Sequence, residues 1–209
     1  MHFNLNLTGR IPKFNRSSHL EVMGLAVTSF SGKLPDSIGN LKSLYWLDVR
    51  ECNFSGPIPS SFANMTKLMY LDLSSNNFSR GTLSWVGKQT KLTVLFLVNI
   101  NLYGDIPFSI GNLTKLTTLS LGSNELTGPI PSWLANLPQL NTLWLPKNKL
   151  FGPIPTSISN LLNLQILDLY LNNLNGTIEF DLFQKLNNLS HLSLSFNKLS
   201  LVIDPNTTT

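Results

Sequence analysis

The stretch that decides the fold covers residues 113–131 and reads LTKLTTLSLGSNELTGPIP. Its leucines stand at positions 113, 116, 119, 121 and 126, and the stretch closes on Pro-Ile-Pro. Residues 137–155 and 161–178 follow the same pattern, displaced by 24 and 48 positions. A fixed period of this length is the sequence signature of a protein built from stacked repeats.

The period extends over most of the chain. Steps of 24 residues, with one step of 25, give eight units that start at residues 17, 41, 65, 89, 113, 137, 161 and 186. We therefore expect eight repeats over residues 17–203, the tail of a preceding repeat in 1–16 and a polar tail in 204–209. The consensus L-x-x-L-x-L-x-x-N/C-x-L of these units is that of a leucine-rich repeat.

The spacing inside a unit predicts its structure. In Leu119-Ser-Leu121 the apolar residues alternate, which favours a short strand with both leucines pointing inward. One unit cannot cover its own leucines, so stacking buries them in one elongated core. The predicted fold is an α/β solenoid, a leucine-rich-repeat horseshoe with a parallel β-sheet on the concave face and short 3-10 or helical turns on the convex face.

A polar residue recurs shortly after each strand, where the chain must turn. Its amide can pair with backbone groups of neighbouring turns that would otherwise be buried without a partner. We expect this structural Asn ladder at Asn76, Asn124, Asn148, Asn172 and Asn197, with Cys52 and Thr28 in equivalent positions and Ile100 as a break in the series.

The second half of most units carries Gly-x-Ile/Leu-Pro, as in Gly128-Pro-Ile130-Pro131. Glycine permits a turn that other residues would strain, and proline fixes the backbone before the short helical turn that follows. Two units deviate: the segment 80–83 lacks the proline, and the segment 176–179 is followed by an extra residue.

Composition excludes several classes of protein. The chain is 42% hydrophobic and 12% charged with a formal charge of +4, which argues against a disordered chain and a coiled coil. Lys and Arg are scattered, so nucleic acid is not an expected partner. A single cysteine excludes an intrachain disulfide and a multi-thiolate metal site, and we expect no cofactor or metal. No apolar stretch is long enough to span a membrane, and the first residues lack the features of a signal peptide.

The repeat resembles a known family. A 24-residue unit with L-x-G-x-I-P resembles the plant-specific class of leucine-rich repeats. The phrases LPDSIGNLKSL from residue 34, CNFSGPIPSSF from residue 52 and IGNLT from residue 110 resemble the ectodomains of plant leucine-rich-repeat receptor-like proteins of the disease-resistance type. The segments 83–92 and 180–189 resemble the same family and account for the two deviating units.

This resemblance implies a non-catalytic, extracellular module of a cell-surface receptor-like protein of the plasma membrane. In that family the ectodomain is secreted as a glycoprotein, capped by paired cysteines and anchored by a membrane span, and it acts in defence or developmental signalling through partner kinases. The implied partners are a peptide or protein ligand and a co-receptor kinase. The chain resembles an internal slice of such an ectodomain, which predicts exposed leucines at both ends.

Two alternatives stay open at this point. Plant polygalacturonase inhibitors share the repeat, so an inhibitor of a microbial cell-wall-degrading enzyme is the second hypothesis. A truncated fragment without function is the third.

Outward-facing strand residues form the concave surface, the usual binding face of a solenoid. Exposed Trp, Tyr and Arg dominate binding hot spots. We therefore expect ligand contacts at Trp46, Arg50, Tyr70, Phe96, Trp144 and Tyr170. The alternative is that such residues only cover neighbouring strands. Asp48, Asp72 and Asp168 recur with the repeat, which favours a structural or solubility role.

Nine Asn-x-Ser/Thr sequons are candidates for N-glycosylation: Asn6, Asn15, Asn53, Asn64, Asn77, Asn112, Asn175, Asn188 and Asn206. Catalysis is not expected. The three histidines lie far apart in a repeat architecture, and no hydrolase, metalloprotease or nucleotide-binding motif occurs. Cys52 occupies a ladder position, so we expect a buried weak donor there and no nucleophile.

Overall fold

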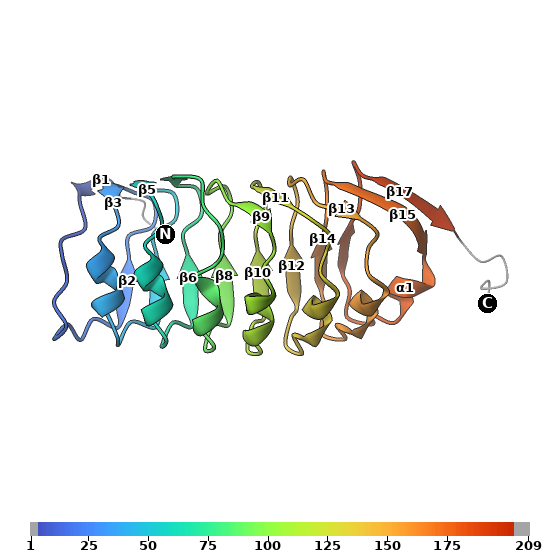
Figure 1. Cartoon of the computed structure of the whole chain (residues 1–209), viewed down its shortest axis with the longest axis horizontal. Coiled ribbons are helices and arrows are strands. Elements are labelled where there is room, and N and C mark those ends of the chain that lie inside the picture. The colour runs from blue at the N-terminus through green and yellow to red at the C-terminus, as the bar shows by residue number, and fades with distance from the viewer. Residues whose placement is uncertain (1–3, 203–209) are drawn as a thin grey trace.

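The computed structural model describes residues 4–202 and shows an elongated solenoid (Figure 1). The polar tail expected at 204–209 lies outside the described residues. The main sheet is parallel and contains eight strands, each next to the strand of the following unit. They are β2 (Val22–Gly24), β4 (Trp46–Asp48), β6 (Tyr70–Asp72), β8 (Val94–Phe96), β10 (Thr118–Ser120), β12 (Thr142–Trp144), β14 (Ile166–Asp168) and β16 (His191–Ser193).

The register of the main sheet follows the sequence period. Trp46 pairs with Val22 on one side and with Tyr70 on the other, a step of one 24-residue unit each time. The last pair, Ile166 with His191, steps by 25 residues. Equivalent residues of successive units therefore lie side by side, and the predicted leucine-rich-repeat fold is confirmed.

Helical turns run along the other side of the rod (Figure 1). Five of them begin directly after the proline of Gly-x-Ile/Leu-Pro: η1 (Asp36–Asn40), η2 (Ser60–Asn64), η4 (Phe108–Asn112), η5 (Ser132–Asn136) and η6 (Thr156–Asn160). In the two deviating units the turn differs. A shorter turn, η3 (Val86–Lys88), follows Trp85, and an α-helix, α1 (Asp181–Gln184), occupies the last position.

A second layer of strands lies along one edge of the solenoid (Figure 1). It consists of the sheet β1-β3-β5-β7, the pair β9-β11 and the sheet β13-β15-β17. Their bounds are β1 (Asn4–Gly9), β3 (Thr28–Lys33), β5 (Asn53–Gly56), β7 (Asn77–Phe78), β9 (Tyr103–Asp105), β11 (Glu125–Thr127), β13 (Phe151–Gly152), β15 (Asn173–Glu179) and β17 (Lys198–Val202). Between β7 and β9 only a single bridge, Gly81 to Leu102, continues the layer, at the unit that lacks the proline. Gly128 shows why the motif needs glycine, since its φ is +79° and a Cβ would lie 2.6 Å from Asp105 Oδ1.

The core is one continuous column of leucines between the main sheet and the helical turns. Leu119 and Leu121 are fully buried, as are their equivalents in the neighbouring units. The terminal units differ, because Leu5 and Leu201 are 63% and 53% exposed. Apolar residues therefore reach solvent at both ends of the described chain.

The polar ladder pairs the backbone between units. Asn148 Nδ2 donates to Leu121 O of the preceding unit at 3.0 Å, and Asn148 Oδ1 accepts from Leu126 N–H at 3.0 Å. Asn76, Asn124, Asn172 and Asn197 make the same pair of bonds. Cys52 takes this position with a thiol, which is buried and donates to Leu25 O at 3.0 Å.

Each turn before the ladder contains one residue with a left-handed backbone. These residues have φ between 50° and 58° and are Val27, Glu51, Ser75, Asn99, Ser123, Lys147, Leu171 and Phe196. A branched residue such as Val27 is disfavoured in this conformation. Pairing of the turn with the neighbouring unit, as in Glu51 N–H to Ser74 O at 2.9 Å, holds the conformation in place.

Asn148→Ala tests the ladder. The substitution removes the partner of Leu126 N–H and one of the two amides that donate to Leu121 O, the other being that of Asn124, which costs about 1–3 kcal/mol of unfolding free energy. Urea denaturation followed by circular dichroism measures this loss. Asn136→Ala, at an exposed position at the end of η5, is the control and should cost less than about 0.5 kcal/mol. Equal losses in both variants would contradict this role for the amide.

Gln89 is a polar residue in an apolar column. It is fully buried, and its Oε1 has no partner. Its Nε2 donates to Phe62 O at 2.7 Å, but that carbonyl already accepts from Met65 N–H at 2.9 Å. The equivalent residues of the neighbouring units are Met65 and Leu113, both fully buried.

Gln89→Leu should therefore stabilise the protein by about 1–2 kcal/mol, because it removes an unpaired buried acceptor and adds apolar contact. The reciprocal change, Leu113→Gln, should destabilise it. Urea midpoints of the two variants measure both effects. A lower midpoint for Gln89→Leu would contradict the prediction and show that the Gln89 amide stabilises the folded state.

Candidate functional site

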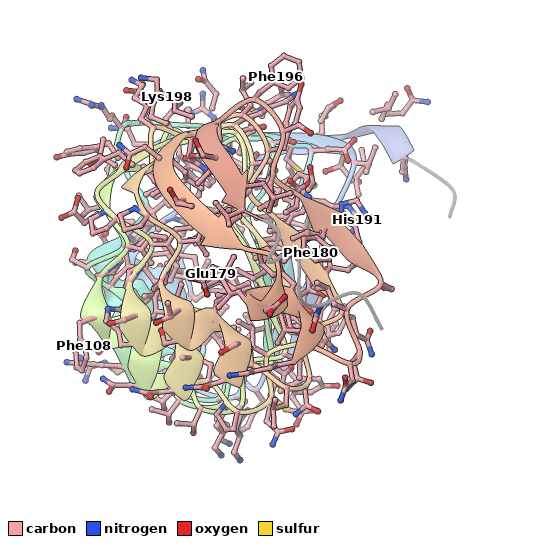
Figure 2. All side chains as sticks on the ribbon, turned by 90° about the vertical axis from the view of Figure 1, so that its right-hand side faces the viewer. Phe108, Glu179, Phe180, His191, Phe196 and Lys198 are labelled. Carbon is pink, nitrogen blue, oxygen red and sulfur yellow. The ribbon has the colours of Figure 1, made fainter. Side chains whose placement is uncertain are left out.

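The candidate site is the outward face of the main sheet, the face expected to be concave, which we call the concave face. Its residues are those that precede each strand, point outward from it, or follow it in the turn. Register places equivalent side chains in rows across the strands, so Trp46, Tyr70 and Val94 are neighbours on β4, β6 and β8. Figure 2 shows His191 of β16 on the side of the main sheet and Phe108 on the opposite, helical side.

Three of the six expected ligand contacts form one cluster, which we call the aromatic corner: Trp46, Tyr70 and Phe96. The rings of Trp46 and Tyr70 are stacked, with centroids 3.7 Å apart and an interplanar angle of 5°. Phe96 meets Tyr70 edge to face at 6.1 Å. Trp46 remains 39% exposed, so the corner offers an open apolar surface to a ligand.

Arg50 lies beside this corner between two carboxylates. Its Nη1 is 3.5 Å from Asp48 Oδ2 and 3.9 Å from Asp72 Oδ2. Both aspartates also have a structural role, because Asp48 Oδ1 accepts from Arg50 N–H at 3.2 Å and Asp72 Oδ1 accepts from Ser74 N–H at 2.9 Å. Asp168 Oδ1 accepts from Tyr170 N–H in the same way, at 2.9 Å. The recurring aspartates thus bind the turn that follows their strand.

The environment of the corner shifts two pKa values. Burial, helped by the negative charges of Asp72 and Asp48, raises the pKa of Tyr70 to about 12. Burial also raises the pKa of Asp72, against the effect of its hydrogen bonds from Ser74. Tyr70 is therefore a neutral phenol at any physiological pH, and its ring serves as contact surface.

The other expected contacts lie further along the face. Trp144 of β12 is half-buried and passes over Gly122, where a Cβ would lie 2.7 Å from its Cζ3. Tyr170 meets Phe196 edge to face at 5.2 Å. Phe196 is 68% exposed and was not among the expected contacts, although it aligns with Lys147 and Glu51 in the turn positions.

The sequons avoid this face. Of the nine candidate asparagines, Asn206 lies outside the described residues and the other eight are exposed. Those on strands lie in the second layer, on β1, β5, β7 and β15, and Asn64 and Asn112 end helical turns. None of the eight lies on a strand of the main sheet, so glycans attached to them would leave the strands of the concave face free.

Among residues 4–202, no three His, Cys, Asp or Glu side chains come together as metal ligands. In the same range, no helix has the length and apolarity to cross a bilayer.

Asp72→Asn tests the electrostatics of the corner. Because the folded state raises the pKa of Asp72 above its ordinary value of 3.8, ionised Asp72 lowers stability at neutral pH. The variant should therefore melt at a higher temperature at pH 7, and this gain should shrink as the pH falls toward the ordinary carboxyl pKa and wild-type Asp72 takes up its proton. Calorimetry across this pH range measures the effect. Asp105→Asn, an exposed carboxyl in the second layer, is the control, and an equal gain there would contradict the assignment.

The chain is similar to several known proteins. The leucine-rich-repeat family model matches residues 43–65, 67–88 and 115–137. A 47-residue segment is 47% identical to Receptor-like protein 6 of Arabidopsis thaliana, covering 22% of this chain and 5% of that protein. The plant peptide hormone receptor RGFR1, solved in complex with RGF2, superposes with a TM-score of 0.86 and 38% identity over 92% of this chain and 31% of the receptor chain.

A second plant receptor also superposes on most of this chain. The Arabidopsis receptor kinase HAESA, solved with the peptide hormone IDA and the co-receptor SERK1, superposes with a TM-score of 0.76 and 35% identity over 87% of this chain. The chain spans only 30% of that receptor chain, so it corresponds to a minor part of the length of these relatives. Leucine-rich-repeat receptor ectodomains are generally non-catalytic binding modules. The chain is therefore a leucine-rich-repeat solenoid of the kind that forms the ectodomains of plant receptors.

Proposed function

We propose that this chain is the ligand-recognition part of a plant cell-surface receptor-like protein, and that it binds a peptide or protein on the concave face of its eight repeats. The observation that carries the proposal is the aromatic corner. A stacked Trp46–Tyr70 pair that remains open to solvent is the kind of surface that dominates binding energy in protein interfaces.

The rest of the molecule supports this role. The concave strands carry no sequon among the described residues, whereas the helical turns and the second layer carry several. RGFR1 and HAESA are receptors solved with peptide ligands, and HAESA is solved with a co-receptor. By analogy the chain acts outside the cell, without enzymatic activity, in defence or development, and a partner kinase transmits the signal.

Selection from a random nonapeptide phage library on the purified protein tests the proposal. Peptides enriched on the wild-type chain should lose at least about tenfold in affinity on Trp46→Ala, because the substitution removes the exposed ring of the corner. Phe108→Ala removes an exposed aromatic ring on the helical side and should leave the affinity unchanged. Fluorescence anisotropy with the enriched peptides measures both.

The opposite pattern would overturn the proposal. Peptides that bind Trp46→Ala as tightly as wild type, but lose affinity on Phe108→Ala, would move the binding surface to the helical side. Inhibition of a fungal polygalacturonase by the wild-type chain would instead favour the inhibitor hypothesis.

A further inference from the structure

The concave face carries a charge opposite to that of the chain as a whole. Its acidic residues are Glu21, Asp48, Glu51, Asp72 and Asp168, and its basic residues are Arg50 and Lys147. The face therefore has a formal charge of −3, whereas the whole chain has +4. Complementary charge steers partners and excludes wrong ones, so this face favours a ligand of net positive charge.

Charge and apolar surface coincide at the aromatic corner. Arg50 neutralises only one of its two neighbouring carboxylates, and its distances of 3.5 and 3.9 Å exceed those of a tight charge-assisted hydrogen bond. The aspartate side chains are 13% and 5% exposed, so they act mainly through their field, while the ring of Trp46 provides the accessible surface. A cation over such a ring gains both the cation–π attraction and the attraction of the excess carboxylate charge.

Building on the proposed function, we propose that the ligand is an extended basic peptide, and that a Lys or Arg side chain of this peptide seats on the Trp46–Tyr70 pair while Arg50 acts as a built-in competing cation. The main-sheet strands from β4 to β14 span about 24 Å, which an extended peptide of about seven residues covers. Tyr170 and Phe196 lie at the far end of this span and offer a second contact for an apolar side chain.

The strands between the aromatic corner and the Tyr170–Phe196 pair carry uncharged outward residues, which agrees with this arrangement. Thr118, Ser120 and Thr142 face the centre of the span with short uncharged side chains. An anionic ligand would instead have to pair with Arg50, which two carboxylates already hold, and with Lys147 alone beyond it. The face therefore discriminates by charge at one end and by apolar contact at the other.

Two matched sets of labelled nonapeptides test the inference on the full chain. In the first set Lys or Arg alternates with Ser, Phe and Leu, and in the second Glu replaces each basic residue. The basic set should bind wild type more tightly than the acidic set, and the difference should shrink with added salt. Arg50→Gln should raise the affinity of the basic set about two- to fivefold, because it removes the competing cation.

Two further variants separate a local effect from a general one. Lys147→Gln removes the same charge from the same face away from the corner, and it should change the affinity less than Arg50→Gln. Asp72→Asn should lower the affinity of the basic set about tenfold. Its melting temperature, expected to rise at pH 7, reports separately that the variant is folded.

The outcomes are distinct. Tighter binding of the acidic set, with loss of that binding in Arg50→Gln, would overturn the inference and make Arg50 a ligand anchor. Equal binding of both sets, or library peptides without excess basic residues that still depend on Trp46, would overturn it while the proposed function stands. If no library peptide depends on Trp46, the proposed function fails with it.

Discussion

Pairing of buried backbone groups between successive coils is the constraint on which this structure depends. Each coil turns sharply after its main-sheet strand, and the turn lies against the next coil, where water cannot satisfy its amides and carbonyls. A side-chain amide such as that of Asn148 bridges the two coils and completes both turns. The leucines supply the apolar free energy of stacking, and the amide ladder pairs the turn of one coil with the next wherever asparagine occupies the position.

This constraint also defines what the molecule can present to a partner. The leucines that face inward and the turn residues that the ladder holds maintain the fold. The outward strand positions are not needed for it, apart from the aspartates that bind their own turns. Large rings can then accumulate on neighbouring strands and stack across them, as Trp46 and Tyr70 do. Contiguous exposed apolar surface of this kind is uncommon on soluble proteins outside their binding sites.

The sequence predicted most of the fold because its period specifies register. Once the leucines of residues 113 and 137 are aligned, Trp46 must lie beside Tyr70, and the structure has that pairing. The step of 25 residues before the last unit likewise appears in the structure, where Ile166 pairs with His191. Both features depend on backbone spacing, which can be read directly from a repeating sequence.

The rest depends on side-chain rotamers and on contacts between units. The near-parallel rings of Trp46 and Tyr70, and the place of Arg50 between two carboxylates, cannot be derived from spacing. The left-handed residue in each turn escaped prediction because Val27, Glu51 and Phe196 share no chemistry that favours such a backbone. Phe196 was not chosen as a ligand contact, although it occupies the same turn position as Glu51 and Lys147.

The 25-residue unit shows how the solenoid accommodates a change in length. Its extra residue lies between Ile178 and Leu186, where α1 replaces the 3-10 turn, and Ile166 still pairs with His191. The helical side thus absorbs an insertion without shearing the concave sheet. A fluorophore loop or an affinity tag engineered at the turns of that side would report on the molecule while leaving its inner wall intact.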